Sequence, residues 1–174
     1  MNILETLPQA PLWKGHLHIA MAPTKNMDRT EWFAEKATEI GINAITCLNC
    51  RFSERKEIKP IRLEKILVSA MKQSQKATLP ALEGMTDFKK FVATPFDGRK
   101  FIAHCEEGEK PLLKHTYQPG ENALILIGPE GDFSPEEIKL AQENGFEPIS
   151  LGESRLRTET AALVACHTIH VLNQ

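Results

Sequence analysis

Three loops rich in glycine and charged residues hold the side chains that could bind a ligand and act on it. They are the segments 104–109, 128–132 and 151–157, and each follows a short apolar run. Glycines in the second and third loops allow backbone amides to approach a ligand closely, and neighbouring leucine and isoleucine side chains could contact a flat apolar ring. Arg155 and Arg157 could stabilise negative charge that develops on a substrate. The loops therefore predict a ligand-binding site.

Other patterns that often carry chemistry are incomplete or absent. Cys47 and Cys50 form a C-x-x-C, but neither a second pair nor a histidine at zinc-finger spacing accompanies it, and the pair does not open a predicted helix. The sequence contains no G-x-x-x-x-G-K-[ST], G-x-G-x-x-G or G-x-S-x-G motif. We therefore expect no metal site, and P-loop, Rossmann and serine-hydrolase chemistry are disfavoured.

The middle loop lies between a predicted strand and a predicted helix. The run 123–127 is apolar without alternation, as expected for a strand of a parallel sheet that is covered on both faces. Ser134 then opens a helix as N-cap, Glu137 completes a capping box, and Gly145 ends the helix. Ligands of open α/β sheets bind beyond the carboxyl ends of the strands, so this loop is the first candidate site.

Similar patterns predict the remaining elements of a mostly parallel α/β sheet flanked by helices. Strands are expected at 16–21, 42–48, 100–105 and 148–151. Helices are expected from Asp28, with Glu31 completing a capping box and Gly41 as the stop, from Pro60, over 86–92, and from Thr158, as cap, to Leu172. The last helix is apolar nearly all round, which predicts burial in the core or against a partner subunit.

Charge is unevenly distributed along the chain. The net charge of −2 excludes a protein that coats nucleic acid wholesale but allows a local basic patch. Segment 51–76 contains eight basic residues against three acidic ones. The predicted helix from Pro60 places four of these cations on its outer face, where they could bind RNA phosphates or simply be solvated: Arg62, Lys65, Lys72 and Lys76.

The composition also indicates the cellular compartment. No apolar run approaches the ~20 residues that a membrane-spanning helix needs, and no apolar segment follows a basic N-terminus. Four cysteines in 174 residues lack the density of a disulfide-bonded secreted scaffold. We therefore expect a cytoplasmic protein without a membrane partner.

Two longer motifs resemble the signatures of a known family. Segment 127–134 with Glu137, followed by segment 151–161, is similar to the two signatures of the small-subunit ribosomal RNA (uracil-N3)-methyltransferases, which belong to the SPOUT superfamily. The likeness runs from about residue 16 to the C-terminus and includes Lys25, Asp28, Arg29, Trp32, Lys36, Ala37, Glu39, Gly41, Gln73, Ser74 and Pro80. The resemblance implies a parallel α/β domain with a C-terminal trefoil knot, which acts as a homodimer on ribosomal RNA of the small subunit.

The resemblance also implies the cofactor and the roles of individual residues. The cofactor is S-adenosyl-L-methionine, and the expected contacts are His104, Cys105, Ile127, Gly128, Pro129, Glu130, Gly131, Leu151, Gly152, Leu156, Arg157 and Thr158. Methylation of a uridine at N3 removes a proton and spreads negative charge onto the flanking carbonyls, so guanidinium groups are expected to assist. The candidates for this role are Arg157, Arg155 and Arg29.

The sequence departs from the family in three respects. Members carry an N-terminal RNA-binding barrel, so residues 1–15 are interpreted as a linker or a remnant of that domain, and residues 16–174 as the methyltransferase domain. Lysines stand at 72 and 76, on either side of Gln73-Ser74, where the family has an acid and an arginine, and Asp132 replaces a usual glycine. Two alternatives remain: a catalytically silent RNA-binding remnant, and an unrelated nucleotide-binding α/β enzyme.

Overall fold

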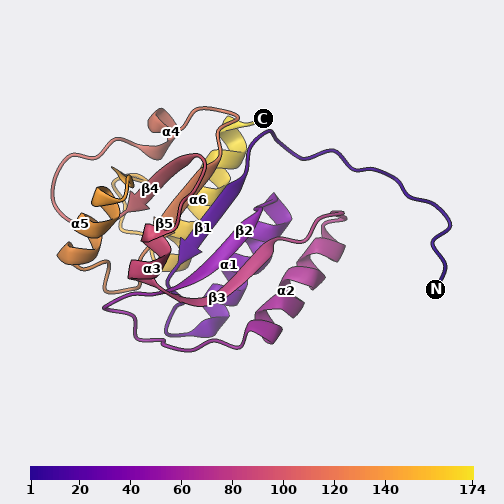
Figure 1. The fold of residues 1–174 in the computed structure, drawn as a ribbon, viewed down its shortest axis with the longest axis horizontal. Helices are drawn as coiled ribbons and strands as arrows, with labels where there is room; N and C mark the ends of the chain where they lie inside the picture. The colour runs from indigo at the N-terminus through magenta and orange to yellow at the C-terminus, as the bar shows by residue number, and fades with distance from the viewer.

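The protein is built on one parallel sheet with helices on both faces (Figure 1). The structure is a computed structural model that describes residues 1–174. Its six strands are arranged in the order β3-β2-β1-β5-β4-β6, and every neighbouring pair is parallel. The predicted α/β class is therefore confirmed.

The elements alternate along most of the chain. The strands are β1 (Leu17–Met21), β2 (Ala44–Asn49), β3 (Ala81–Asp87), β4 (Arg99–Ala103), β5 (Ala123–Ile127) and β6 (Glu147–Ile149). The helices are α1 (Met27–Ile40), α2 (Pro60–Gln73), α3 (Phe88–Ala93), α4 (Leu113–Thr116), α5 (Pro135–Glu143) and α6 (Thr158–Leu172). None of these helices is both long enough and apolar enough to cross a membrane.

Side chains of the central strands alternate between two hydrophobic cores. Ile19 and Met21 of β1 belong to the larger core, which includes side chains from α1, α2 and α6. Ala20 lies on the other face, in the smaller core with residues of α3 and α5. All five residues of β5 are buried, as its unbroken apolar run predicted for a strand covered on both faces.

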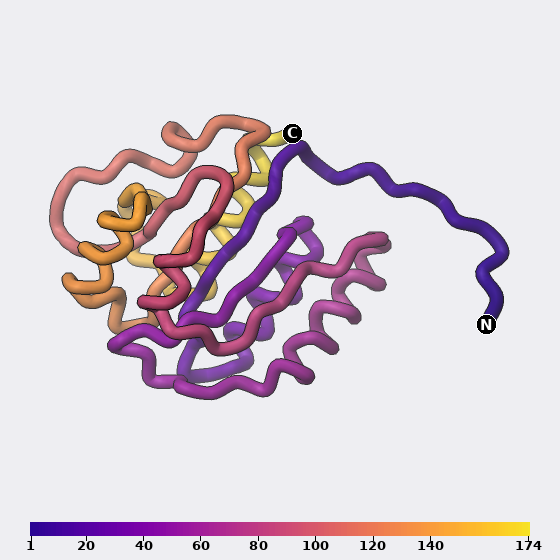
Figure 2. Tube along the Cα trace, in the orientation of Figure 1, coloured from indigo at the N-terminus to yellow at the C-terminus, as the bar shows by residue number.

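The N-terminal segment leads away from the domain and enters the core only near its end (Figure 2). Residues 1–12 are exposed, whereas Trp13 is 8% exposed and packs edge-on against His170 with the ring centroids 5.2 Å apart. The side chain of Gln9 accepts a hydrogen bond from the backbone N–H of Ala77 at 2.7 Å. The linker at 1–15 stays a prediction, although packing into the domain begins by Trp13.

Two helix starts differ from the prediction. The N-cap of α1 is Asn26, whose side chain accepts from the N–H of Asp28, so Asp28 lies inside the helix. Arg157 occupies the N-cap position of α6, which has no side-chain cap. The hydroxyl of Thr158 instead donates to the carbonyl of Gly128 at 3.1 Å. A tertiary hydrogen bond therefore takes the side chain that the sequence suggested for capping.

Two elements were not predicted, and the helix expected at 86–92 begins two residues later. β3 is an edge strand whose residues are partly exposed, and it contains Glu83 and Gly84, which are uncommon in strands. Its pairing with β2 decides its structure. α4 is a four-residue helix, too short to show a periodic pattern.

The capping box at Ser134 and the two glycine stops are confirmed, whereas the capping box expected at Asp28 and Glu31 does not form. Ser134 and Glu137 bond each other's backbone N–H groups at the start of α5. Gly41 and Gly145 both have positive φ, of 118° and 87°. α6 is less exposed than its composition suggested: Ala162, Ala165, Cys166 and Ile169 are buried within this chain, and Val171 is its one large hydrophobic residue that is strongly exposed, at 48%.

Candidate functional site

A pocket of about 880 Å³ lies at the carboxyl edge of the sheet. The segments that follow β1, β4, β5 and β6 supply most of its lining, together with the first turn of α6. β1 and β5 are neighbours, and the chain proceeds from β1 to β2 and β3 on one side while β4 and β6 lie on the other. Open α/β sheets bind ligands where the strand order reverses in this way.

All of the residues predicted to contact the cofactor line this single pocket. From the loop after β4 come His104 and Cys105, from the end of β5 and its loop come Ile127, Gly128, Pro129, Glu130 and Gly131, and from the segment before α6 come Leu151, Gly152, Leu156, Arg157 and Thr158. The predicted catalytic arginines Arg29 and Arg155 line it as well. The structure therefore brings together segments that are far apart in the sequence.

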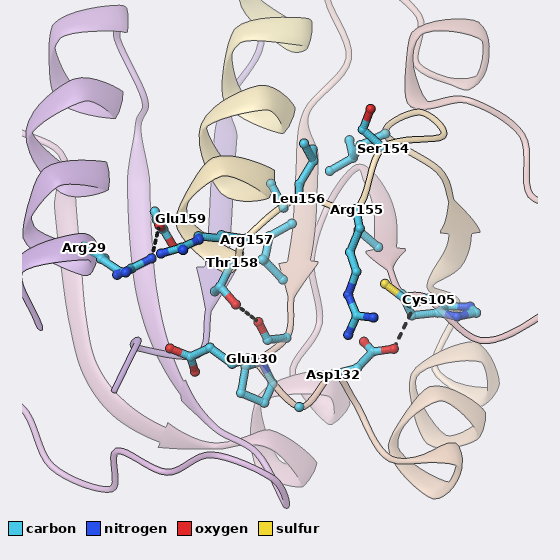
Figure 3. A pocket seen from close by; sticks show the side chains of 18 of the residues that line it. Arg29, Cys105, Glu130, Asp132, Ser154, Arg155, Leu156, Arg157, Thr158 and Glu159 are labelled. Carbon is cyan, nitrogen blue, oxygen red and sulfur yellow. Dashed lines mark hydrogen bonds and ion pairs between the residues drawn. The ribbon is translucent and has the colours of Figure 1, made fainter. Parts of the chain in front are cut away.

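Hydrogen bonds between the loops fix the shape of the pocket (Figure 3). Besides the bond from Thr158 to Gly128, the carboxylate of Asp132 accepts from the N–H of Cys105 at 2.9 Å. The carboxylate of Glu130 accepts from the N–H of Lys25 at 2.9 Å. Each bond joins two loops, so the lining is held by contacts within the protein before any ligand binds.

Asp132 has an uncommon backbone conformation. Its φ of 66° lies in the left-handed region, where glycine is favoured and aspartate is tolerated better than most other residues. The usual glycine of the family at this position agrees with that geometry. The carboxylate of Asp132 adds the bond to the loop after β4, which a glycine cannot make.

A loop that follows β2 contacts the segment after β1 and contributes Glu54 to the pocket lining. The guanidinium of Arg55 donates to the carbonyls of Thr24 and Lys25, at 3.0 and 2.6 Å. Glu54 forms an ion pair with Lys25 at 3.2 Å, although both side chains are largely exposed and the pair adds little stability. The loop thus holds in place the segment that follows β1.

The arginines of the pocket differ in their partners. Arg29 forms an ion pair with Glu159 at 3.2 Å, and the Glu159 side chain is only 11% exposed. Arg155 and Arg157 are exposed and take part in no ion pair. Figure 3 shows Arg157 directed toward Arg29 and Glu159, and Arg155 directed toward the side of the pocket where Asp132 lies. The two unpaired guanidinium groups are available to an anionic or polar ligand.

His104 is held neutral in the wall of the pocket. Burial, followed by the positive charge of Lys110, lowers the pKa of His104. Its Nδ1 accepts from the N–H of Glu106 at 3.2 Å, which leaves Nε2 as the protonated nitrogen. This Nε2 is buried without a partner in the protein.

Several lining residues were not predicted from the sequence, among them Lys25, Asn26, Glu54, Ser154 and Glu159. Lys25 and Asn26 lie in the loop after a predicted strand, so the rule that ligands bind beyond strand ends could have included them. Glu159 lies inside the second motif, but its pairing with Arg29 joins residues 130 positions apart. No local pattern predicts that contact.

The predicted RNA-binding residues lie on α2, outside this pocket. Arg62, Lys65 and Lys72 are exposed, and Lys76 is partly buried just beyond the helix. Arg62 donates through two nitrogens to the carboxylate of Glu31, with the longer contact at 3.2 Å. The guanidinium is therefore partly neutralised within the protein.

The C-x-x-C pair is unsuited to thiolate chemistry. Both Cys47 and Cys50 are buried and free. Burial raises the pKa of Cys47 to about 12 and also raises the pKa of Cys50, so neither thiol ionises readily near neutral pH.

The fold and the pocket define a class: a parallel α/β domain with a pocket between loops at the carboxyl edge of its sheet. The chain matches the family model of the RNA methyltransferase domain over residues 11–170. The chain therefore belongs to this family, as its two motifs indicated, and its predicted enzyme class is confirmed.

Relatives with similar sequences carry one name. Ribosomal RNA small subunit methyltransferase E of Rickettsia conorii is 29% identical over 164 residues, which cover 93% of this chain and 67% of that protein. The protein of the same name from Buchnera aphidicola (subspecies Acyrthosiphon pisum) is 30% identical over 178 residues, covering 98% of this chain and 68% of that protein. The chain thus spans about two thirds of the length of these relatives.

Solved structures with a similar fold are also named as ribosomal RNA methyltransferases. A probable rRNA-methyltransferase from Porphyromonas gingivalis is 47% identical with a TM-score of 0.89, over 95% of this chain and 70% of that one. Ribosomal RNA small subunit methyltransferase E from Neisseria gonorrhoeae, bound to S-adenosyl methionine, is 26% identical with a TM-score of 0.82, over 91% of this chain and 66% of that one. These matches support the SPOUT-type α/β fold expected from the sequence.

Proposed function

We propose that this chain transfers a methyl group from S-adenosyl-L-methionine to N3 of a uridine in small-subunit ribosomal RNA. One observation carries the proposal: both motif loops and three arginines converge on a single pocket at the carboxyl edge of the sheet. The names of the relatives and the cofactor bound to the Neisseria gonorrhoeae enzyme support the substrate and the methyl donor. The choice of N3 rests on the resemblance of the two motifs.

The pocket has the size and lining that the cofactor needs. Its volume of about 880 Å³ falls in the range of small-molecule sites. Ile127, Leu151 and Leu156 offer apolar walls for the adenine ring. A Cβ atom added to Gly152 would meet no protein atom within 4 Å, so there is open space directly beside that backbone. These features fit a nucleoside held against closely approaching backbone.

The chemistry divides between the cofactor and the protein. S-adenosyl-L-methionine supplies an electrophilic methyl group when it is bound. The protein has to position the uracil ring and accommodate the negative charge that appears when the N3 proton leaves. Arg157 and Arg155, which have no acidic partner, are the candidates for contacting that charge. Arg29 is paired with Glu159, so it is better placed to hold the Glu159 carboxylate and the adjoining pocket wall in position.

The target base has to leave its stack to enter this pocket, because an enzyme cannot reach a ring nitrogen that is used in base pairing. The basic residues Arg62, Lys65, Lys72 and Lys76 are proposed to contact RNA phosphates outside the pocket. Lys65 and Lys72 are the strongest candidates of the four, since both are exposed and neither forms an ion pair.

Further expectations from the resemblance belong to the same proposal. They are the homodimer, the C-terminal trefoil knot, and the division into a remnant at 1–15 and a methyltransferase domain at 16–174. The dimer now rests on the resemblance, because much of the apolar surface of α6 is already covered within this chain. A substrate in the small ribosomal subunit would place the protein in the cytoplasm.

Isothermal titration with S-adenosyl-L-methionine, and separately with ATP, tests the proposal. Saturable binding of the first ligand and none of the second is expected. Binding of neither ligand would favour a catalytically silent RNA-binding remnant, and binding of ATP alone would contradict the cofactor assignment. Methyl transfer to small-subunit ribosomal RNA, mapped to the modified atom by mass spectrometry, then tests the choice of N3.

A variant can test the position of the cofactor. Gly128→Val is ambiguous, because a Cβ there would already lie 3.1 Å from Cδ2 of buried Phe133. Leu156→Asp changes the pocket wall at a half-buried position instead, and should weaken cofactor binding by about tenfold or more through lost apolar contact. Leu79→Asp is the matched control, since Leu79 is exposed and lies outside the pocket. Equal affinity of both variants would argue against this site.

A further inference from the structure

Phe52 presents an aromatic ring beside the pocket without a role in the hydrophobic core. It lies in the loop between β2 and α2 and is 46% exposed, among the largest apolar side chains on the surface. Its own Cβ lies close to the backbone of Gly131, because a Cβ added to that glycine would be 3.2 Å away. Phe52 therefore rests on the loop that lines the proposed cofactor site.

Hydrogen bonds on both sides of Phe52 hold its backbone in place. Cys50 and Ser53 bond each other across a tight turn, with the N–H of Cys50 donating to the Ser53 hydroxyl at 3.0 Å. The N–H of Arg51 donates to buried Glu137 at 3.1 Å. Arg55 then ties the following residues to the carbonyl of Lys25 at 2.6 Å. The ring is thus presented from a fixed turn.

Two cations without acidic partners lie in the same loop as this ring. Arg51 is exposed and takes part in no ion pair, and the ammonium of Lys56 reaches only the Asn49 side chain and the Cys50 carbonyl, at 3.5 and 3.4 Å. Of the carboxylates in the same loop, Glu54 is paired with Lys25, and Glu57 is unpaired. Exposed aromatic rings combined with unpaired cations are the features that bind single-stranded nucleic acid.

We propose that Phe52 stacks against a base of the RNA next to the target uridine, while Arg51 contacts a backbone phosphate. This inference rests on the proposed function. A base that leaves its stack to enter the pocket also removes a stacking partner from its neighbour, and an aromatic ring at the edge of the pocket can replace that partner. A single ring in a loop that also carries unpaired cations offers too little contiguous apolar surface for a typical protein partner.

Fluorescence anisotropy with a labelled single-stranded 12-nucleotide RNA of uridine and adenine tests this role. Phe52→Ala and Phe52→Leu should weaken binding by roughly 5- to 100-fold, whereas Phe52→Tyr retains a ring and should bind like the wild type. The fold-loss of RNA affinity in the Phe52→Ala and Phe52→Leu variants should be the same at every salt concentration. Arg51→Ala should instead flatten the log-log salt dependence by about 0.7. Unchanged melting temperatures would confirm that the variants fold.

The controls separate this inference from the proposed function. A 12-nucleotide chain of abasic ribose phosphates should bind the wild type and Phe52→Ala equally, because it has no base to stack. If the wild type binds cofactor and methylates RNA but Phe52→Ala and Phe52→Leu bind RNA normally, the stacking role is wrong and the proposed function stands. Retained binding by Phe52→Leu alone would reduce the contact to simple apolar packing and would overturn stacking. Failure of the wild type to bind any RNA would also overturn the inference, whereas failure to bind S-adenosyl-L-methionine would contradict the proposed function.

Discussion

At the scale of single residues, ion pairing distinguishes the three arginines of the pocket. The charge of Arg29 is partly compensated by Glu159, which is almost fully buried and would be destabilised without a cationic partner. Arg157 lies between β6 and α6 with its guanidinium unpaired. We therefore propose different roles, in which Arg29 maintains the pocket and Arg157 acts on the substrate.

Arg157→Lys tests that difference. Lysine keeps the positive charge but loses the planar fork of the guanidinium, so single-turnover methyl transfer should slow by about 10- to 100-fold if Arg157 contacts the developing charge. The melting temperature should stay unchanged, because Arg157 makes no ion pair within the protein. Arg155→Lys makes the same exchange in the same loop and tests the second candidate for contacting that charge. A rate equal to that of the wild type for Arg157→Lys would remove it from the catalytic group.

Residue types could be predicted more reliably than their partners. The motif loops could be recognised because glycine, arginine and leucine have distinct uses near a ligand. Thr158 was expected to cap α6, yet its hydroxyl reaches the carbonyl of Gly128, 30 residues away. The alternatives, a helix cap and a tertiary bond, use the same hydroxyl, and only the folded arrangement of β5 and α6 decides between them.

At the scale of elements, Gly41 at the C-terminus of α1 is required both by the backbone geometry of the helix end and by packing against the N-terminal segment. Gly41 has a φ of 118°, and its N–H donates to the carbonyl of Ala37 at 2.9 Å. A Cβ at this position would lie 2.6 Å from Cδ1 of Leu12 and 3.3 Å from the ring of Trp13. The stop therefore also determines how the N-terminal segment reaches the core.

Gly41→Ala should destabilise the protein by about 1–3 kcal/mol, since alanine is strained at positive φ and also displaces a neighbour. Gly84→Ala is the matched control, because its φ is not positive and the added Cβ would meet only Pro60 at 3.6 Å. Urea unfolding of both variants measures the difference. Equal midpoints would show that the turn at Gly41 adapts without strain.

His18 of β1 is held in its neutral form within the paired strands β1, β2 and β3. His18 donates from Nε2 to the hydroxyl of Thr46 at 2.7 Å, and that hydroxyl donates to Glu83 at 3.3 Å. Burial, followed by the charge of His16, lowers the pKa of His18 from 6.5 to about 4. The unfolded chain therefore binds a proton more readily than the folded protein between these two values.

Stability should fall as the pH decreases through this window. The contribution of His18 is fully present above its unfolded pKa of 6.5, and is lost progressively as the pH approaches the folded value of about 4. Between pH 7.5 and 5 the loss should be about 2 kcal/mol. Urea unfolding of the wild type and His18→Gln over this range isolates the effect from the other histidines. A parallel decline in both proteins would show that His18 is not responsible.

The most buried strand of this protein could be predicted from the sequence, whereas the exposed edge strand could not. β5 was recognised from its sequence because both of its faces are covered, which demands an unbroken apolar run. β3 was missed because an edge strand with exposed side chains imposes no such demand. Pairing with β2 stabilises its backbone, and this non-local contribution leaves little trace in the sequence.

At the scale of the whole molecule, the proposed RNA contacts extend from the pocket across one face of the protein. α2 connects β2 to β3, which are parallel neighbours, so it runs from the carboxyl edge of the sheet back to the amino edge (Figure 1). Its 14 residues cover about 21 Å. Arg62 and Lys65 lie near the edge that holds the pocket, whereas Lys72 and Lys76 lie near the opposite end.

An RNA strand that enters the pocket would have to follow α2 to reach Lys72 and Lys76. If it does so, each neutralised phosphate contributes to the slope of the logarithm of the binding constant against the logarithm of the salt concentration. The contribution is about −0.7 for a single strand and about −0.9 for a duplex. Lys72→Ala/Lys76→Ala should therefore flatten that dependence by about 1.4 to 1.8. The measurement is a set of anisotropy titrations with small-subunit ribosomal RNA over a range of salt concentrations.

The pair Lys89→Ala/Lys90→Ala provides the matched control for that measurement. It likewise removes two lysines, which are exposed and consecutive in α3, but α3 packs into the smaller core on the other face of the sheet. A nonspecific effect of net charge would change the salt dependence equally in both double variants, whereas a path along α2 changes it only in the first. Wild-type slopes in both would mean that the basic face of α2 is merely solvated, and that RNA contacts are confined to the carboxyl edge around Phe52 and the pocket.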